Sequence, residues 1–164
     1  MESRDLNADI EQVLALLHSD LLARNVTVTT ELLPDLRPVS GDHIQLQQVL
    51  LNLIVNGCDA MQANAPDERR LVVTTERAAD GMVCVSVRDY GTGVEPEVIE
   101  RIFDTFYSTK ASGLGMGLSI CRAIVRAHGG LLWASNNPDR GATFHFTLRL
   151  GEGEQTSQTT QRQG

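Results

Sequence analysis

Several features are scarce or missing in this chain of 164 residues, and each absence excludes a class of protein. No signal peptide and no apolar run long enough to span a bilayer is present, which favours a cytoplasmic location for these residues and leaves open an anchor elsewhere in a longer parent. The 14 Lys and Arg against 21 Asp and Glu give a formal net charge of −7. No basic patch can then neutralise several phosphates in series, so we expect no nucleic-acid partner.

Cysteine is also scarce. Cys58, Cys84 and Cys121 lie in apolar helix or strand patterns, and no two of them have CxxC spacing. This distribution argues against a disulfide framework and against a metal site built from thiolates. We therefore expect three buried free thiols in a reducing compartment.

The most informative feature that is present is a glycine-rich loop, GLGMGLSI, at 113–120. Its three alternating glycines, Gly113, Gly115 and Gly117, run directly into an amphipathic helix. Glycines let backbone N–H groups turn toward an anion, and the helix adds unpaired first-turn donors and the positive end of its dipole. The loop predicts a phosphate site, although a turn that only ends a helix or shapes a hairpin fits the same letters.

A second motif, DYGTG, follows a predicted strand at 82–87. Val83, Val85 and Val87 alternate on one face of that strand, and the period of two places Asp89 on the same inward face. A carboxylate aimed at the core needs hydrogen-bond donors, and the exocyclic amine of a purine with its bound water is a suitable partner. The alternative is that Asp89 simply opens an Asx-type turn before the glycines.

A third pattern lies on a predicted helix at 45–61. At about 100° per residue, five polar side chains fall within one stripe roughly 80° wide. They are Gln45, Gln48, Asn52, Asn56 and Asp59. Amide and carboxylate oxygens at this spacing can supply the hard ligands that Mg²⁺ accepts beside waters and phosphates, and a polar face paired with neighbouring loops is the alternative. Asn is a poor helix former, so two of them in mid-helix indicate a specific role.

These motifs, in this order and spacing, resemble the boxes of sensor histidine kinase catalytic domains, whose superfamily includes DNA gyrase and ATP-clamp chaperones. NLIVN with Asp59 resembles the N box, DYGTG the first glycine box, IFDTFYSTK the F box and GLGMGLSI the second glycine box. The resemblance covers about 20–150, and GGLLW and GATFHF are similar to the last two strands of that family. It implies an ATP site between a mixed sheet and a layer of helices.

The resemblance implies a role for each matching residue. Asn56 would be the chief Mg²⁺ ligand, with Asn52 beside it and facing the phosphates. Asp89 would accept from the adenine amine, and Thr143 would place a hydroxyl near the adenine-bound water. Lys110 would reach a terminal phosphate as a compact cation, unless it is only a solvated lysine on the loop. The other implied nucleotide-binding positions are Asp59, Gly91, Gly93, Gly113, Leu114, Gly115, Met116, Gly117 and Leu118.

Position 52 separates branches of this superfamily. The ATP-hydrolysing clamp proteins resemble one another in having a glutamate there to activate water, whereas Asn52 cannot act as a base at neutral pH. The resemblance therefore implies a chain that holds Mg-ATP and donates its γ-phosphoryl group, with Asn52 and Lys110 as the expected catalytic residues. Phe103 and Phe106 are expected to anchor the lid by apolar packing.

The phosphoacceptor of that family is a histidine near the start of a long helical hairpin, and no such hairpin fits before the nucleotide motifs here. The histidines of this chain lack catalytic or metal-ligand spacing and are interpreted as structural or surface residues. They are His18, His43, His128 and His145. We expect a catalytic module, monomeric by itself, that serves the dimerisation and phosphoacceptor domain of a homodimeric parent and, through it, the receiver domain of a response regulator.

Two other functions remain open at this point. A serine kinase of the anti-sigma type has the same kind of site and phosphorylates a protein in trans, whereas a nonenzymatic ATP-binding docking module needs no acceptor. The Ser-Thr-Lys end of the F box and the GMGLSI sequence resemble nitrogen- and oxygen-sensing histidine kinases more closely.

Periodicity predicts an α/β two-layer sandwich, and the resemblance implies a mixed, mostly antiparallel sheet that packs against helices beside a glycine-rich lid. Helices are expected at 5–24, 45–61, 96–102 and 118–127, and strands at 26–32, 71–77, 82–87, 131–135 and 142–150. We assign 1–24 to a helical segment that leads in from the absent domain, 25–150 to the ATP-binding domain and 151–164 to a disordered tail. Only two residues separate Lys110 from Gly113, and we expect this short lid, at about 104–116, to be mobile without nucleotide.

Overall fold

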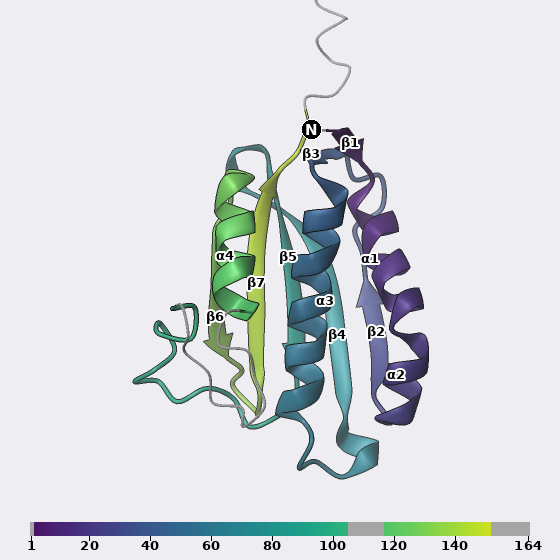
Figure 1. The fold of residues 1–164 in the computed structure, drawn as a ribbon, viewed down its shortest axis with the longest axis vertical. Coiled ribbons are helices and arrows are strands. Elements are labelled where there is room, and N and C mark those ends of the chain that lie inside the picture. Colours follow the sequence, from purple (N-terminus) through teal and green to yellow (C-terminus); the bar gives the residue numbers. More distant parts are fainter. Residues whose placement is uncertain (1, 105–116, 152–164) are drawn as a thin grey trace, which may run out of the picture.

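The computed structural model describes residues 2–104 and 117–151. Within them, five strands form one sheet in the order β2-β4-β5-β7-β6, and the helices cover one face of it (Figure 1). The helices are α1 (Leu6–Leu16), α2 (His18–Ala23), α3 (His43–Ala60) and α4 (Gly117–Ala127). The strands are β2 (Thr27–Glu31), β4 (Arg70–Ala78), β5 (Met82–Asp89), β6 (Leu132–Asn136) and β7 (Ala142–Arg149). The predicted two-layer α/β sandwich is confirmed.

The sheet is mixed in the predicted sense. Strands β2 and β4 run parallel, and α3 lies in the chain that connects them. The pairs β4–β5, β5–β7 and β6–β7 are all antiparallel. Parallel neighbours need a long crossover connection, and the 18-residue helix α3 supplies it here.

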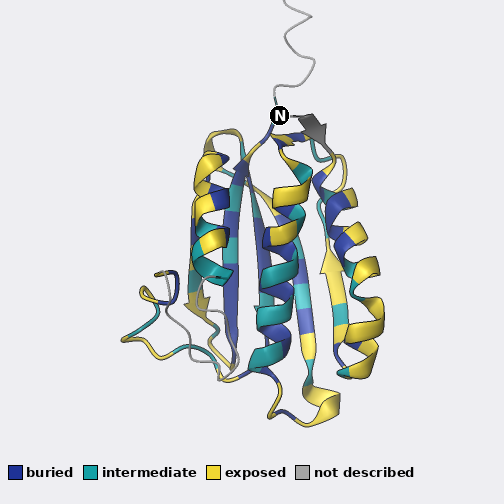
Figure 2. Ribbon diagram, in the orientation of Figure 1, coloured by how far each residue is buried: buried dark blue, intermediate teal, exposed yellow. Residues whose placement is uncertain are grey.

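One hydrophobic core fills the space between the two layers. Strand β5 contributes the alternating Val83, Val85 and Val87, each at most 1 % exposed, as the sequence pattern predicts. Figure 2 shows the buried residues along the facing sides of the strands and helices, with exposed residues on the outer sides of the helices. Leu6 and Ile10 of α1 belong to the same cluster, so the N-terminal helical segment packs on the same core as 25–150.

The N-terminal helix is divided where the sequence predicts one continuous helix over 5–24. Asp5 caps α1 by accepting from the backbone N–H of Ala8 at 3.2 Å. Leu17, with ψ of 3°, ends α1 and begins α2, because this ψ departs from the helical value. The prediction of a single helix is therefore wrong, although both pieces lie within its bounds.

Two short strands were not predicted. Strand β1 (Glu2–Arg4) pairs antiparallel with β3 (Val39–Gly41), which directly precedes α3. A strand of three residues is too short to show alternation in the sequence, so its formation depends on the partner strand. Asp42 then caps α3 by accepting from the N–H groups of Ile44 and Gln45 at 3.0 and 3.3 Å.

The predicted helix at 96–102 is wrong, because this segment forms successive turns instead. The backbone N–H of Val98 donates to the carbonyl oxygen of Glu95, and that of Arg101 donates to the carbonyl oxygen of Val98. Both bonds span three residues, and the segment forms no helix. An α-helix would need bonds between residues four apart. Ile102 and Phe103 at the end of these turns are nevertheless buried, each 7 % exposed.

Apart from Asp104, the predicted mobile lid at 104–116 lies outside the described residues, and so does the predicted tail apart from Gly151. In the part of the chain that the structure describes, no helix has the length and apolar character needed to cross a bilayer.

Candidate nucleotide-binding site

The elements that carry the described members of the predicted site meet at one end of the molecule. The carboxyl ends of α3 and β5 lie there beside the β6–β7 connection and the start of α4, at the end opposite the N-terminus (Figure 1). The backbone carbonyl of Ala60, the last residue of α3, would stand 2.3 Å from a Cβ on Gly91. Only a glycine at 91 therefore allows the chain after β5 to pass this close to the end of α3.

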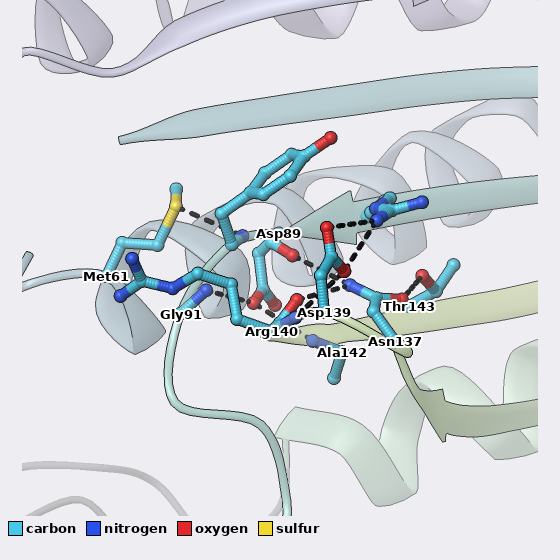
Figure 3. Close-up of polar contacts among 10 residues, drawn as sticks. Met61, Asp89, Gly91, Asn137, Asp139, Arg140, Ala142 and Thr143 are labelled. Atoms are coloured by element: carbon cyan, nitrogen blue, oxygen red, sulfur yellow. Dashed lines mark hydrogen bonds and ion pairs between the residues drawn. The ribbon is translucent and has the colours of Figure 1, made fainter. Parts of the chain in front are cut away.

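Asp89, the last residue of β5, is the buried acid of this site, with 2 % of its surface exposed. Its Oδ1 accepts from the backbone N–H of Gly91 at 2.9 Å and of Ala142 at 3.2 Å (Figure 3). The bond from Gly91 closes the Asx-type turn that was the alternative interpretation, but it uses only one of the two oxygens. Among the described residues none donates to Oδ2. The turn and an available acceptor for a ligand therefore coexist.

The electrostatics of Asp89 follow from this geometry. Burial raises the pKa of its carboxyl, and the two backbone N–H groups of Gly91 and Ala142 oppose that rise. A further donor brought to Oδ2 would favour the charged form and satisfy an acceptor that is otherwise left to water. The arrangement suits recognition of an N–H group on a ligand, such as the amine of adenine.

The two asparagines of α3 lie half-buried on the face that the sequence predicts. Asn52 donates from Nδ2 to the thiol sulfur of Cys121 on α4 at 3.5 Å, so the amide faces the helix that follows the glycine loop. Asn56 makes no hydrogen bond with any described residue, which leaves its amide oxygen available. No cluster of three or more His, Cys, Asp or Glu that could hold a metal occurs in the described part of the chain. The available amide oxygen of Asn56 fits a Mg²⁺ ion that takes its other ligands from waters and phosphate oxygens.

Asp59, the carboxylate of the predicted stripe, is engaged elsewhere. Its Oδ1 accepts from Nη1 of Arg24, which follows α2, at 2.9 Å. This bond is the largest of the causes that raise the pKa of Arg24. The structure thus joins Asp59 to the N-terminal helices by an ion pair, an attachment that the helical pattern could not indicate.

Thr143 does not reach the carboxylate of Asp89. Its hydroxyl donates to Oδ1 of Asn137 at 2.5 Å. Along β7, Ala142 and Phe144 point inward, so alternation places Thr143 on the other face of the sheet. Ala142 is instead the β7 residue that contacts Asp89, through its backbone N–H. The structure thus shows the Thr143 hydroxyl bonded to Asn137, and its expected place near an adenine-bound water stays a prediction.

The phosphate side of the site is described only in part. Gly117 and Leu118, both half-buried, begin α4 and present its N-terminus at this end of the fold. Phe103 packs edge to face against Phe144, with ring centroids 6.1 Å apart, as expected for an anchor of the lid. The predicted contacts of Phe106, Lys110, Gly113, Leu114, Gly115 and Met116 lie outside the described residues.

Sequence reasoning missed a set of loop side chains that hold the backbone after β5. Asn136 donates to and accepts from the backbone of Val94, at 2.7 and 2.8 Å, beside Gly93. Asn64 and Asn137 donate to the carbonyls of Tyr90 and Asp89, each at 2.9 Å. Loop residues follow no helix or strand period, so no local pattern in the sequence could have indicated these contacts.

These features define a nucleotide-binding domain. They are a two-layer sandwich, the buried carboxylate of Asp89, the asparagines of α3 and the helix α4 that begins at a glycine. Residues 41–152 match the family described as histidine kinase-, DNA gyrase B-, and HSP90-like ATPase. This match spans more than half of the chain, so the chain belongs to that family. Membership implies that the ligand of the site is ATP.

Curated relatives are sensor proteins. Sensor protein FixL of Bradyrhizobium diazoefficiens is 45 % identical over 139 residues, which are 85 % of this chain and 27 % of FixL. Sensor protein TdiS of Thauera aromatica is 41 % identical over 147 residues, 89 % of this chain and again 27 % of the relative. The chain therefore spans about a quarter of the length of these relatives.

Solved structures give the same class. The nucleotide-free catalytic domain of histidine kinase ThkA has a TM-score of 0.80 and 33 % identity, with coverage of 92 % of this chain and 97 % of that domain. ThkA in complex with response regulator protein TrrA has a TM-score of 0.77 and 30 % identity, with coverage of 92 % of this chain and 42 % of that one. The chain has the fold of a histidine kinase catalytic domain.

Proposed function

We propose that this chain binds Mg-ATP and donates its γ-phosphoryl group to a histidine on a separate dimerisation domain, from which the phosphate passes to a response regulator. The observation that carries this proposal is the buried carboxylate of Asp89, which keeps one oxygen available in a fold shared with histidine kinase catalytic domains. The names of the relatives support it, since FixL and TdiS are sensor proteins and ThkA has been solved with a response regulator.

The chain's own residues divide the work of binding. Asp89 accepts from the adenine amine and so fixes the base at the end of β5. Asn56 offers an amide oxygen to the metal, and Asn52 lies one turn earlier, toward α4. When bound, Mg²⁺ neutralises charge on the phosphates, which is most of what phosphoryl transfer requires of this domain. Lys110 adds a cation at the terminal phosphate.

The same proposal concerns the surroundings of the domain. The acceptor histidine belongs to a dimerisation domain, so the parent is a homodimer while this module alone is a monomer. ATP is the phosphoryl donor and is held in the cytoplasm, so the module acts there, whether or not other segments of the parent are anchored in a membrane.

Calorimetric titration with ATP, with and without Mg²⁺, tests the nucleotide step. We expect magnesium-dependent binding to wild type, weaker binding to Asp89→Asn, and binding to Asn56→Ala that no longer depends on magnesium. An exposed substitution away from the site, Arg77→Ala, is the matched control and keeps wild-type affinity. A folded wild-type chain that binds no ATP would contradict the proposal and favour a docking module.

Transfer of radiolabelled phosphate from ATP to an added dimerisation and phosphoacceptor domain tests the second step. Phosphohistidine is labile in acid and stable in base, whereas phosphoserine shows the opposite behaviour. We expect an acid-labile label on the acceptor. An acid-stable label would instead indicate a serine kinase of the anti-sigma type.

A further inference from the structure

We propose that Arg140 and Asn137 are positioning residues that hold the Asp89 turn ready for the base, and that they thereby set selectivity for a purine that carries an exocyclic amine. The proposal rests on the proposed function, because it takes adenine as the group that meets Asp89. It concerns the connection between β6 and β7, which no sequence motif assigned to the site.

Asn137 is bonded at both ends of its amide (Figure 3). Nδ2 donates to the backbone oxygen of Asp89 at 2.9 Å and to that of Arg140 at 3.0 Å. Oδ1 accepts from the hydroxyl of Thr143. One side chain thus ties the end of β5 to the β6–β7 connection and to the start of β7.

Asn64, which is 7 % exposed, holds the backbone carbonyl of the next residue, Tyr90. Its Nδ2 donates to the backbone oxygen of Tyr90 at 2.9 Å, and its Oδ1 accepts from Nη2 of Arg140 at 3.2 Å. The consecutive carbonyls of Asp89 and Tyr90 are therefore each held by an asparagine. Both asparagines are bonded to Arg140, one through its carbonyl and the other through its guanidinium.

The hydrogen bonds made by Asn64, Asn137 and Arg140, called the frame from here on, determine which oxygen of Asp89 is available. Oδ1 accepts from Gly91 and Ala142, on the two segments that the frame joins. Gly141 packs against the same residue so closely that a Cβ there would stand 2.2 Å from the Asp89 backbone oxygen. Rotation of the carboxylate would break both bonds to Oδ1, so Oδ2 is presented in one direction before any ligand arrives. Such preorganisation improves affinity for a ligand with a donor at that point and selects against one without it.

The frame can be disturbed without loss of the fold. Arg140 also contacts Oε1 of Glu68 at 3.2 Å, but these side chains are 45 % and 55 % exposed. Exposed ion pairs contribute little to stability. Arg140→Ala is therefore expected to fold like wild type and to alter mainly the order of the Asp89 turn.

The experiment measures the dissociation constants of ATP and of purine riboside triphosphate, which lacks the exocyclic amine, at one magnesium concentration. It compares the whole chain with Arg140→Ala, Asn137→Ala and the control Arg77→Ala. For wild type and the control we expect the amine to improve affinity by about tenfold or more, as for a hydrogen bond to a charged group. For Arg140→Ala and Asn137→Ala we expect this ratio to fall to about threefold or less, with the loss mainly in ATP affinity.

Hydrogen exchange of the free protein supplies a readout that needs no nucleotide. The amides of Gly91 and Ala142, which donate to Asp89, should exchange several times faster in Arg140→Ala than in wild type, whereas amides in the middle of β5 should not change. If Asn137→Ala fails to fold, Arg140→Ala decides the result on both readouts.

The outcomes separate this inference from the proposed function. A wild-type chain that binds neither nucleotide overturns the proposed function. If the amides of Gly91 and Ala142 also exchange at the same rate in Arg140→Ala as in wild type, the positioning role is overturned as well. If wild type discriminates for the amine and Arg140→Ala keeps the same ratio and the same exchange rates, the positioning role is wrong while the proposed function stands. A reduced ratio with faster exchange at those two amides supports it.

Discussion

Gly57 of α3 lies directly over the side chain of Asp89. A Cβ on residue 57 would stand 3.5 Å from the Cβ of Asp89 and 2.7 Å from Cδ2 of Leu71. Helix α3 therefore approaches the end of β5 as closely as its backbone permits at this point. The amides of Asn52 and Asn56, on the same helix, are set relative to Asp89 by that approach.

The glycines near Asp89 should differ in their tolerance of alanine. Gly91→Ala is expected to lower the free energy of unfolding by about 3 kcal/mol or more, because the new Cβ would stand 2.3 Å from the carbonyl oxygen of Ala60, a backbone atom. Gly57→Ala should cost far less, because the end of the Leu71 side chain can shift and alanine favours the helix by about 1 kcal/mol. Urea denaturation measures both. Gly117→Ala, with no atom within 4 Å of its Cβ, is the control, and equal losses at 57 and 91 would contradict this prediction.

Asp89→Asn should separate binding from stability. At neutral pH we expect a free energy of unfolding equal to or above that of wild type, because the variant no longer buries a charge, together with weaker ATP binding. Thermal denaturation and calorimetry of the same samples measure the two effects. A large loss of stability would mean that the charged carboxylate is needed for the fold.

The pH dependence of that comparison has a definite sign. Burial raises the pKa of the Asp89 carboxyl above its ordinary value of 3.8, so the folded chain binds this proton more tightly than the unfolded chain does. The free energy of unfolding of Asp89→Asn should therefore exceed that of wild type most at pH values above the pKa of the folded state. The difference disappears below pH 3.8. Denaturation midpoints measured from neutral to acid pH should converge. A difference that grows toward acid pH would show that the pKa is lowered instead.

The cysteines should react in a fixed order. Burial raises the pKa of the Cys58 and Cys121 thiols to about 11, and it also raises that of Cys84, which is only half-buried. At neutral pH we expect slow modification of Cys84 in the folded chain and modification of the other two only after unfolding. Timed alkylation followed by mass spectrometry of peptides gives the order. Early labelling of Cys121, which touches Asn52, would mean that α4 opens readily.

His128 should donate from Nδ1 and accept at Nε2. Nδ1 lies 2.8 Å from the carbonyl oxygen of Ile124, which can only accept, and Nε2 accepts from the backbone N–H of Asp42 at 3.1 Å. Nitrogen NMR shifts of the ring report the tautomer directly. His128→Ala should cost about 1–3 kcal/mol, because it leaves the N–H of Asp42 without its partner. The opposite tautomer would contradict the contact between α4 and the start of α3.

Local patterns predicted the elements of the fold well. The alternation of Val83, Val85 and Val87 placed Asp89 inward, and the structure confirms this because a strand's side chains must alternate. The helix expected at 45–61 is α3, which begins two residues earlier at its Asp42 cap. Three expectations failed. The helix expected at 5–24 is divided at Leu17, the turns at 96–102 lack helical bonds, and β3 is too short to show any spacing.

The order of motifs in the sequence also identified the family, because each box combines residue types that a phosphate, a metal or a base requires. No local pattern could show how the site is assembled. The bonds from Asn64 to Tyr90, Asn137 to Asp89 and Arg140 to Asn64 join residues 26, 48 and 76 positions apart.

The sequence by itself therefore determined most of the secondary structure, the inward carboxylate and the family of this chain, since these depend on periodicity and on residue type. Only the tertiary structure decided which oxygen of Asp89 stays available, that Asp59 pairs with Arg24, and that Thr143 lies on the other face of the sheet from Asp89. The physical reason is that hydrogen bonds between distant loops form only after the two layers have packed and brought those loops together.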